Sequence, residues 1–388
     1  MEAFEASLAK AVEELKRRKG EAVLIHHDEA DGVCSAAIVK EALEKIGLGV
    51  KTLCLDKLFP EVLEKTLSES TVTVFTDIGS AHVKKIEEAL GGESLAVIID
   101  HHDTQPSGRS NVLNLNPELH GYRGESDASA STVAYFFARK ADESLRRLAH
   151  LAVIGSVEIP GEASGFNRIV LEDSLKQGVV KQSGRDFKIV AEGFGVSRVK
   201  GSQTLTLLAS VGYYKGGVEK ALNACVKGFT PETLRFSESL EEERSRANKA
   251  LLASIARRGL GERRSLQWFD SGSLFKGMGS KVLGSFTSYL SYQRLVDGNK
   301  YLIGFMKIPR EIPGYGLLSR NYTKASARAP PDLRRMIEKG FKPPLSKILP
   351  EACVRNGGFG DGHSVAASGV IPAGAEENFL ETFDSLVG

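Results

Sequence analysis

The first half of the chain alternates short apolar runs with segments of helical periodicity. Apolar runs that fit buried strands lie at 22–25, 51–55, 71–75 and 97–99. Apolar positions recur at helical spacing in the intervening or preceding stretches 2–19, 35–46 and about 81–90. Strands that alternate with helices favour a mostly parallel, doubly wound sheet. The pattern therefore predicts an α/β fold for this part of the chain.

The second half has a different pattern. Residues 166–228 have mostly helical character, and a long, highly charged helix pattern follows at 230–259. After residue 262, glycine-rich turns separate strand-like runs at 265–269, 300–308 and 369–371. A chain of 388 residues is long for a single domain. We therefore expect a larger domain at 1–228, a helical connector at 229–261 and a smaller α/β domain at 262–388.

Acidic and imidazole side chains follow three of the predicted strands at their carboxyl ends. The first strand leads to His27, Glu29 and Asp31, the third to Asp77, and the fourth to Asp100, His101 and His102. In one parallel sheet these ends lie at the same edge, where open α/β sheets bind ligands. One Asp after a strand is usually a helix cap. Three such groups favour a divalent-metal site, because carboxylate and imidazole ligands suit Mg, Mn and Zn. Asn116 and Ser129 are candidates to support that site.

Composition restricts the class of protein more than it identifies partners. The apolar content of 41% and charged content of 26% are typical of soluble globular proteins. No apolar run approaches the roughly 20 residues of a membrane span, and the N-terminus lacks a signal-peptide core, so we expect a cytoplasmic protein without membrane association. The widely spaced cysteines fit reduced, buried thiols. A net charge of +2 neither requires nor excludes nucleic acid.

A glycine-rich segment near the C-terminus is a candidate for phosphate binding. It runs from Gly357 through Gly360 and Gly362 to His363 and is expected to form a turn. Glycines let a backbone approach a ligand closely and expose N–H groups to phosphate oxygens. The basic segment 324–328 precedes it and strengthens this interpretation.

Together these motifs resemble the DHH phosphoesterase superfamily. Asp100-His101-His102 matches the name-giving motif, Glu29-Ala30-Asp31-Gly32 is similar to the first motif, and Asp77 matches the second. Ser326-Ala327-Arg328 and the turn that ends in His363 resemble the family's C-terminal associated domain. The similarity covers nearly the whole chain and is strongest to archaeal RecJ-like proteins. That branch includes single-strand-specific nucleases and a degenerate replication factor that associates with the GINS complex and the MCM helicase.

The resemblance implies two divalent cations, Mn²⁺ or Mg²⁺, in a catalytic centre. Asp77 would bridge them, with Glu29 and His27 on one cation and Asp31 and His101 on the other. The remaining residues of the triplet, Asp100 and His102, would support catalysis beside the scissile phosphate. The substrate phosphate would be held by residues of the C-terminal domain, namely Ser326, Arg328, Gly360, Gly362 and His363.

Two positions depart from the family pattern. Glu29 stands where the first motif normally has Asp, and Ile159 stands where the fourth motif normally ends in an Asp ligand. Glu158 lies one residue earlier and is the residue that could replace the missing Asp ligand. The metal site is therefore expected to keep its centre, with one of the two cation sites weakened or lost.

Three functions remain open from the sequence. The favoured one is a Mn²⁺-dependent phosphodiesterase that degrades single-stranded nucleic acid from an end, in DNA replication or repair. The second is a catalytically degenerate scaffold that binds single strands or the GINS and MCM components. The third is a phosphodiesterase for oligonucleotides or cyclic dinucleotides.

Overall fold

The computed structural model describes residues 1–388, which divide into two compact units. Unit 1 comprises Met1–Glu238 with Pro313–Tyr315, and unit 2 comprises Ser239–Ile312 with Gly316–Gly388. The division falls inside the long helix α10 (Pro231–Arg258), which occupies most of the predicted connector. The boundaries 1–228, 229–261 and 262–388 stay a prediction.

Unit 1 is built on a five-stranded parallel sheet with the order β2-β1-β3-β4-β5. Its strands are β1 (Glu21–His26), β2 (Gly49–Cys54), β3 (Val72–Thr76), β4 (Leu95–Ile99) and β5 (Val112–Leu115). Every residue of β3 and β4 is buried. Burial on both faces explains why these strands are continuous apolar runs rather than alternating ones.

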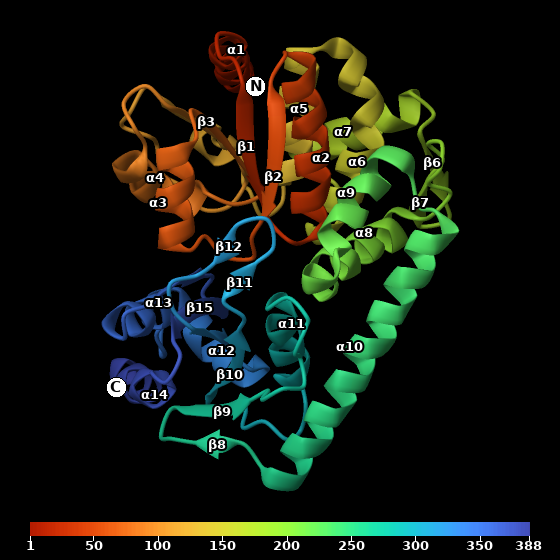
Figure 1. Ribbon diagram of the computed structural model, residues 1–388. Helices are drawn as coiled ribbons and strands as arrows, with labels where there is room; N and C mark the ends of the chain where they lie inside the picture. The colour runs from red at the N-terminus through yellow and green to blue at the C-terminus, as the bar shows by residue number, and fades with distance from the viewer. The chain divides into compact units, whose positions relative to one another are not determined.

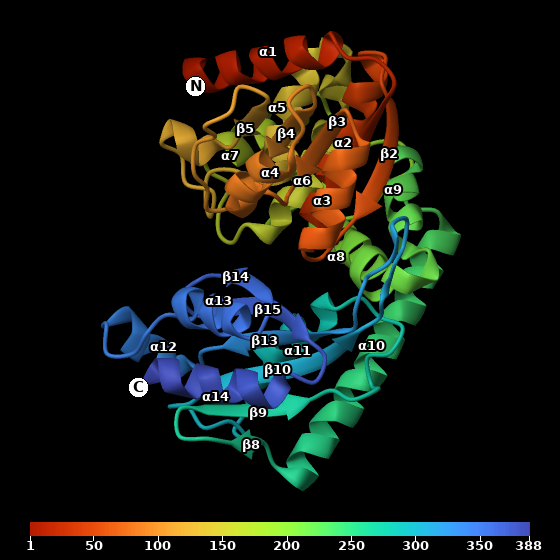
Figure 2. The same cartoon turned by 60° about the vertical axis from the view of Figure 1, so that its left-hand side comes forward.

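Helices cover both faces of this sheet (Figures 1 and 2). Helices α3 (Pro60–Glu69) and α4 (Val83–Ala89) lie on one side, while α2 (Ala30–Lys45) and α5 (Ala130–Ala141) lie on the other. The other helices of unit 1 are α1 (Glu2–Lys16), α6 (Ala149–Gly155), α7 (Gly165–Lys176), α8 (Arg198–Thr206) and α9 (Gly217–Lys227). A small hairpin, β6 (Val180–Ser183) with β7 (Asp186–Ile189), interrupts the stretch that the sequence pattern describes as helical.

Unit 2 has a six-stranded mixed sheet with the order β14-β15-β13-β10-β9-β8. The strands are β8 (Gly261–Glu262), β9 (Leu266–Asp270), β10 (Tyr301–Ile308), β13 (Tyr322–Arg328), β14 (Phe359–Gly362) and β15 (Ala366–Pro372). Only β9 and β10 pair in parallel. A separate hairpin joins β11 (Glu311–Ile312) to β12 (Gly316–Leu317).

Three helices of unit 2 contribute to a second apolar core, namely α12 (Pro331–Glu338), α13 (Leu345–Arg355) and α14 (Glu376–Val387). Helix α11 (Lys281–Leu290) packs against β10 and β13. Tyr301, Phe305, Phe379 and Phe383 are the large side chains of this core. A core of its own in each unit explains why the sequence pattern changes along the chain.

The predicted fold class, a doubly wound mostly parallel α/β domain followed by a smaller α/β domain, is confirmed. Three local predictions were wrong. Helix α2 begins at Ala30 instead of Ser35, so Asp31 lies in its first turn. Residues 359–362 form strand β14 rather than a turn. Residues 114–115, expected to begin a turn at 114–117, belong to β5.

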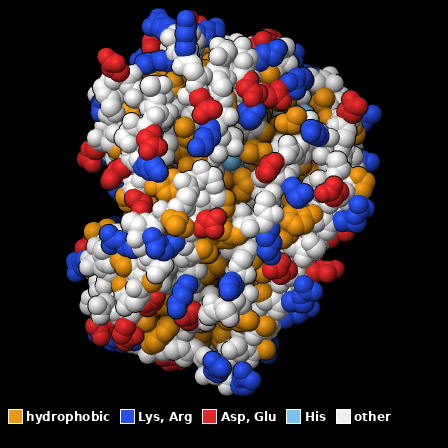
Figure 3. All heavy atoms as spheres, viewed as in Figure 1, with side chains coloured by type: hydrophobic (Ala, Val, Ile, Leu, Met, Phe, Trp, Pro, Cys, Tyr) orange, Lys and Arg blue, Asp and Glu red, His pale blue; other side chains and the backbone are white.

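Surface and thiol features agree with the composition. On the face drawn in Figure 3, acidic and basic side chains are interspersed rather than gathered into one large patch of a single sign. All four cysteines are buried, and none of them is part of a disulfide. No helix combines the length and the apolar character that a membrane span requires.

Candidate metal centre at the carboxyl edge of the parallel sheet

Three strands of unit 1 end at the same level. His26 of β1 is in register with Thr76 of β3, and Thr76 is in register with Ile99 of β4. The next residues along the three strands are His27, Asp77 and Asp100, so they emerge side by side. The chain leaves β1 toward β2 on one side, whereas β3 and β4 lie on the other. Such a reversal of strand order is where doubly wound sheets bind ligands.

Asp77 occupies an unusual turn directly after β3. Its φ of +59° is the only positive value among the non-glycine residues. Asp and Asn tolerate this left-handed conformation better than other non-glycine residues, and such positions cluster at functional sites. The Asp77 backbone N–H still donates to the Ile99 carbonyl, at 3.0 Å. The turn therefore anchors the Asp77 carboxylate at the edge of the sheet.

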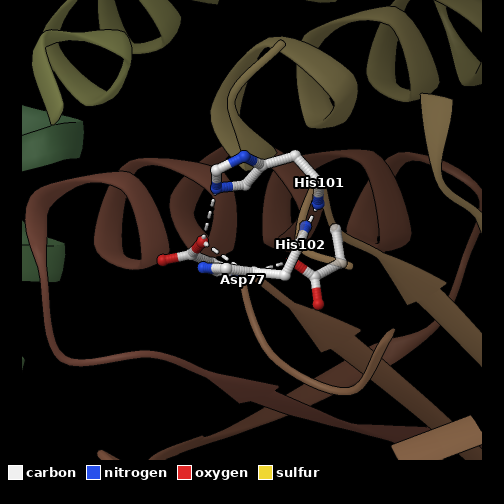
Figure 4. Close-up of side chains that lie close together, drawn as sticks. Asp77, His101 and His102 are labelled. Atoms are coloured by element: carbon white, nitrogen blue, oxygen red, sulfur yellow. Dashed lines mark hydrogen bonds and ion pairs between the residues drawn. The ribbon is translucent and has the colours of Figure 1, made fainter. Parts of the chain in front are cut away.

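Asp77 lies at the centre of the cluster and contacts three histidines. Its Oδ2 lies 3.5 Å from His27 Nδ1, and its Oδ1 lies 3.5 Å from His101 Nε2 and 3.9 Å from His102 Nδ1. Figure 4 shows the side chains of Asp77, His101 and His102 directed toward one another. Ligating atoms of Asp77, Asp100, His101 and His102 all lie within 4.8 Å of one another. Donor atoms at this spacing fit around one cation, whose bonds to such ligands are about 2.0–2.2 Å long.

His101 is oriented by a backbone carbonyl outside the DHH triplet. Its Nδ1 lies 2.8 Å from the carbonyl oxygen of Gly124. A carbonyl only accepts, so Nδ1 carries a hydrogen, and the ring presents the lone pair of Nε2 once Nε2 has lost its proton on cation binding. Nε2 faces the carboxylates of Asp31, at 3.7 Å, and Asp77, at 3.5 Å. This arrangement suits a metal ligand.

Asp31 reaches the cluster from the first turn of α2. Its two carboxylate oxygens accept from the backbone N–H groups of Ala130 and Ser131, each at 2.8 Å. These N–H groups begin α5, so the helix dipole also favours the negative charge. Burial, followed by the charge of Asp77, nevertheless raises the pKa of Asp31. The buried carboxylate therefore needs a positive neighbour.

Asp100 has a different role from the one that its position in the triplet suggests. Its carboxylate accepts from the backbone N–H groups of Ser80 and His101, and lies 2.7 Å from His102 Nδ1. Burial alone would raise the pKa of Asp100, but the charge and hydrogen bond of His102 lower it to about 2. Asp100 thus orients His102, whose side chain remains 43% exposed.

Asn116 supports the same loop. The fully buried Asn116 donates from Nδ2 to the His102 carbonyl, at 2.8 Å, and to Ser80 Oγ, at 2.9 Å. Its Oδ1 accepts from Glu118 N–H, at 2.9 Å. Asn116 therefore ties the end of β5 to the DHH loop. Ser129 caps α5, whose first N–H groups hold Asp31.

The electrostatics of the cluster call for a cation. Burial lowers the pKa of His101, yet the carboxylates of Asp77, Asp31 and Asp100 more than reverse this and raise it to about 10. Burial also opposes ionisation of Asp77, but the neighbouring His101, His27 and His102 lower its pKa below the ordinary value. Carboxylate oxygens and imidazole nitrogens together suit Mn²⁺, with Mg²⁺ favouring the oxygens. The residues present therefore fit a divalent cation.

The edge of the cluster carries the residues that depart from the family pattern. Glu29 is the N-cap residue of α2, and its Oε2 lies 3.7 Å from His27 Nδ1. Glu158 ends a short 3₁₀ helix, Ser156–Glu158, rather than lying in a strand, and it is exposed. Burial raises the pKa of the Cys34 thiol in α2, and Cys225 and Asp31 raise it further. The charge of Glu158 makes the smallest of these contributions. Glu158 is therefore close to the start of α2, although on the exposed side.

The predicted substrate-binding residues come together within unit 2. Ser326 and Arg328 of β13 face β15, which in turn pairs with Gly360 and Gly362 of β14. Gly362 has a φ of +146°, and a Cβ there would lie 2.4 Å from the Cα of Ala367. His363 follows in an exposed turn, and its N–H donates to the Ala366 carbonyl.

Arg328 is held by its own unit. Its Nε donates to Ser288 Oγ at 2.7 Å, and Nη2 donates to the Gly284 carbonyl at 3.3 Å. Nη1 donates to Ser326 Oγ at 3.2 Å. Arg328 therefore fastens α11 to β13, a contact that the sequence alone did not predict.

The sequence and the fold of this chain are similar to those of known proteins. Residues 22–156 match the sequence model of the DHH family, N-terminal domain. An uncharacterized protein of Methanocaldococcus jannaschii is 29% identical over 167 residues, which are 41% of this chain and 38% of that relative. The chain thus spans well under half the length of that relative.

Two solved structures have a similar fold across nearly the whole chain. RecJ in complex with Mn²⁺ from Thermus thermophilus gives a TM-score of 0.64 at 16% identity, covering 99% of this chain and 54% of that one. CDC45 from Entamoeba histolytica gives a TM-score of 0.55 at 12% identity, covering 98% of each chain. At these identities the likeness shows the fold.

Proposed function

Because residues 22–156 belong to the DHH family and the whole chain has a RecJ-like fold, we propose that this protein is a metal-dependent phosphodiesterase that degrades single-stranded nucleic acid from an end. The convergence of Asp31, Asp77 and His101 at one sheet edge carries this proposal. Mn²⁺ is the cation that we propose, as in the RecJ structure with a similar fold. Replication or repair of DNA is the proposed setting.

The side chains divide between two proposed cation positions on either side of Asp77. His27 and Glu29 lie on the Oδ2 side, while His101 and Asp31 lie on the Oδ1 side. Bound cations would supply an activated water and stabilise the leaving oxygen. The chain's own part is to hold these donors in place and to keep His101 in one tautomer.

His102 and unit 2 are proposed to act on the substrate. Asp100 holds His102 Nδ1, which leaves Nε2 of the partly exposed ring for a phosphate oxygen or the leaving group. We assign the phosphate-binding surface to Gly360, Gly362 and His363, with Arg328 and the fully buried Ser326 fixing this surface in place. Backbone N–H groups beside glycines bind phosphate without a bulky side chain in the way.

End-labelled single strands incubated with purified protein and Mn²⁺ test the proposal. We expect shortening of the labelled strand, and a loss of at least about 100-fold in rate for Asp77→Asn, since removing the bridging charge removes the cations. Asp103→Asn is the matched control, because Asp103 is an exposed carboxylate directly after the triplet. The proposed nuclease activity would be refuted if the wild type showed no Mn²⁺-dependent cleavage, or if Asp77→Asn and wild type cleaved at equal rates.

A replication scaffold is the second candidate. Glu29 and Ile159 alter the metal edge, and the CDC45 structure has a similar fold. In this case the protein binds GINS or MCM helicase components and its cleavage rate is negligible. Binding of purified protein to those components, with no cleavage by wild type, would favour the scaffold. Cleavage of cyclic dinucleotides in preference to long single strands would instead favour the small-substrate phosphodiesterase.

A further inference from the structure

Helix α11 of unit 2 has one buried face and one face with exposed tyrosines. Val282, Leu283, Phe286 and Leu290 are buried on the side that packs against β10 and β13. On the other side, the exposed fraction is 51% for Tyr289 and 70% for Tyr292. Helix α11 ends at Leu290, and Tyr292 lies just beyond it in a turn, where its backbone N–H donates to the Tyr289 carbonyl at 3.4 Å. Two exposed aromatic residues are thus joined through one turn at the end of the helix.

The charged residues in the segment that carries the two tyrosines are basic. Residues 281–296 contain no Asp or Glu, but they include Lys281 and Arg294, and Arg294 is exposed. Arg334 of α12, which is ion-paired with Glu338, also lies near Tyr292, since Tyr292 adds to the effect of Glu338 in raising the pKa of Arg334. Exposed hydroxyl-bearing Ser285 shares the outer side of α11. Aromatic rings among cations and hydroxyls suit a polyanion with flat bases.

The tyrosines also adjoin the proposed phosphate-binding surface. Ser288, the residue before Tyr289, accepts from Arg328 Nε at 2.7 Å. Arg328 in turn donates to Ser326 Oγ, at 3.2 Å. Arg328 therefore joins the end of α11 to β13, the strand that pairs with β15 beside the proposed phosphate-binding residues.

We propose that Tyr289 and Tyr292 form a stacking platform for the bases of single-stranded nucleic acid, with Arg294 beside them on the phosphate backbone. The platform rests on the proposed function, because it gives the single strand a place next to the phosphate-binding residues. Stacking on aromatic rings accepts every base, so the platform binds without sequence preference. It would position a strand rather than take part in chemistry.

Binding of a fluorescently labelled oligothymidylate, measured by anisotropy in EDTA, tests the platform separately from cleavage. Losing one stack is expected to weaken binding roughly 5- to 150-fold. We therefore expect Tyr289→Ala and Tyr292→Ala each to weaken binding about 10-fold, with a larger loss for the double variant. Tyr289→Phe and Tyr292→Phe keep the rings and should bind like wild type.

Two controls make the result specific to base stacking. Phe341→Ala removes another exposed ring of unit 2, 73% exposed, and should leave binding unchanged. A strand of the same length without bases should bind wild type as weakly as the double alanine variant binds the normal strand. Thermal unfolding of each variant checks that the fold is intact.

Different results would contradict the stacking platform and the proposed nuclease activity. Alanine variants that bind as tightly as wild type would overturn the platform, even if the wild type cleaves strands. Ring-dependent binding in EDTA would support the platform, even if no cleavage occurs with Mn²⁺. Unchanged strand binding together with lost binding to a helicase component would assign α11 to a protein partner and overturn the proposal.

Discussion

The Nδ1 atom of His101 lies 2.8 Å from the carbonyl oxygen of Gly124, twenty-three residues further along the chain. The Gly124 N–H donates to Glu118 Oε1, at 3.2 Å, so both backbone polar groups of Gly124 are held. A Cβ at position 124 would lie 1.6 Å from the His101 carbonyl oxygen. The loop and the histidine therefore fit together only with glycine at this position.

Gly124→Ala is expected to weaken both the fold and the metal site. The added methyl must displace the His101 backbone, which we expect to lower the free energy of unfolding by roughly 2 kcal/mol. Mn²⁺ affinity should fall about 10- to 100-fold, as for the loss of groups that orient ligands. Thermal unfolding and titration calorimetry measure the two effects. Gly92→Ala, with no atom within 4 Å of the added Cβ, is the control and should behave like wild type.

Asn116→Ala removes three hydrogen bonds, one of which holds the loop Asp100–His102 at the His102 carbonyl. It leaves the buried Ser80 hydroxyl and the His102 carbonyl without this donor. We expect a loss of about 2–3 kcal/mol in unfolding free energy, measured by denaturant titration. Mn²⁺ affinity should fall as well, since the same loop carries the proposed ligand His101. The exposed Asn299→Ala should leave both quantities unchanged, and equal results for the two variants would contradict this role of Asn116.

Stability should depend on pH through the buried His150 of α6. Burial lowers its pKa from 6.5 to about 4, and its ring packs edge-on against Phe194. Between these values the unfolded chain binds a proton that the native protein does not, so stability decreases as the pH falls from 6.5 to 4. The full contribution, roughly 3 kcal/mol, is present above pH 6.5. His150→Phe should flatten this part of the profile of unfolding free energy against pH. An unchanged slope would disprove a buried, neutral His150.

Mn²⁺ should stabilise the wild-type protein against unfolding. Binding to the native state alone contributes about 2.7 kcal/mol at a free concentration of one hundred times Kd. Asp77→Asn should unfold at the same temperature whether or not Mn²⁺ is added. Asn is the suitable substitution because it tolerates the positive φ of this position, so the fold is preserved. A rise in melting temperature of the variant equal to that of wild type would exclude Asp77 as a ligand.

Ile159→Asp tests the proposed weakness of the metal edge. Ile159 directly follows the 3₁₀ helix that ends at Glu158, and it stands where the family pattern has a ligand. If one cation site lacks that ligand, the new carboxylate should tighten Mn²⁺ binding and raise the cleavage rate several-fold. Calorimetry gives the number of bound cations and a labelled strand gives the rate. In Ile159→Asn the new side chain is similar in size to Asp but carries no charge. This variant should show neither tighter Mn²⁺ binding nor faster cleavage.

The fold class and the donor residues were predictable from local patterns. Buried parallel strands are continuous apolar runs, and the polar residues at 27–31, 77 and 100–102 stand out where those runs stop. Parallel strands also bring their carboxyl ends to one edge, so the prediction that these residues meet needed no coordinates. Strands β5, β13 and β14 were harder, because their polar and glycine residues become strand only through pairing with β4, β10 and β15.

The partners that orient the donors depend on tertiary structure. Gly124 meets His101, Ala130 meets Asp31, and Asn116 meets Ser80 across 23 to 99 residues of chain. No local pattern marks Gly124 or Ala130, since a carbonyl or a backbone N–H exists at nearly every position. Folding alone selects which of them face the carboxylates and imidazoles, and it directs the Asp100 carboxylate to His102 Nδ1.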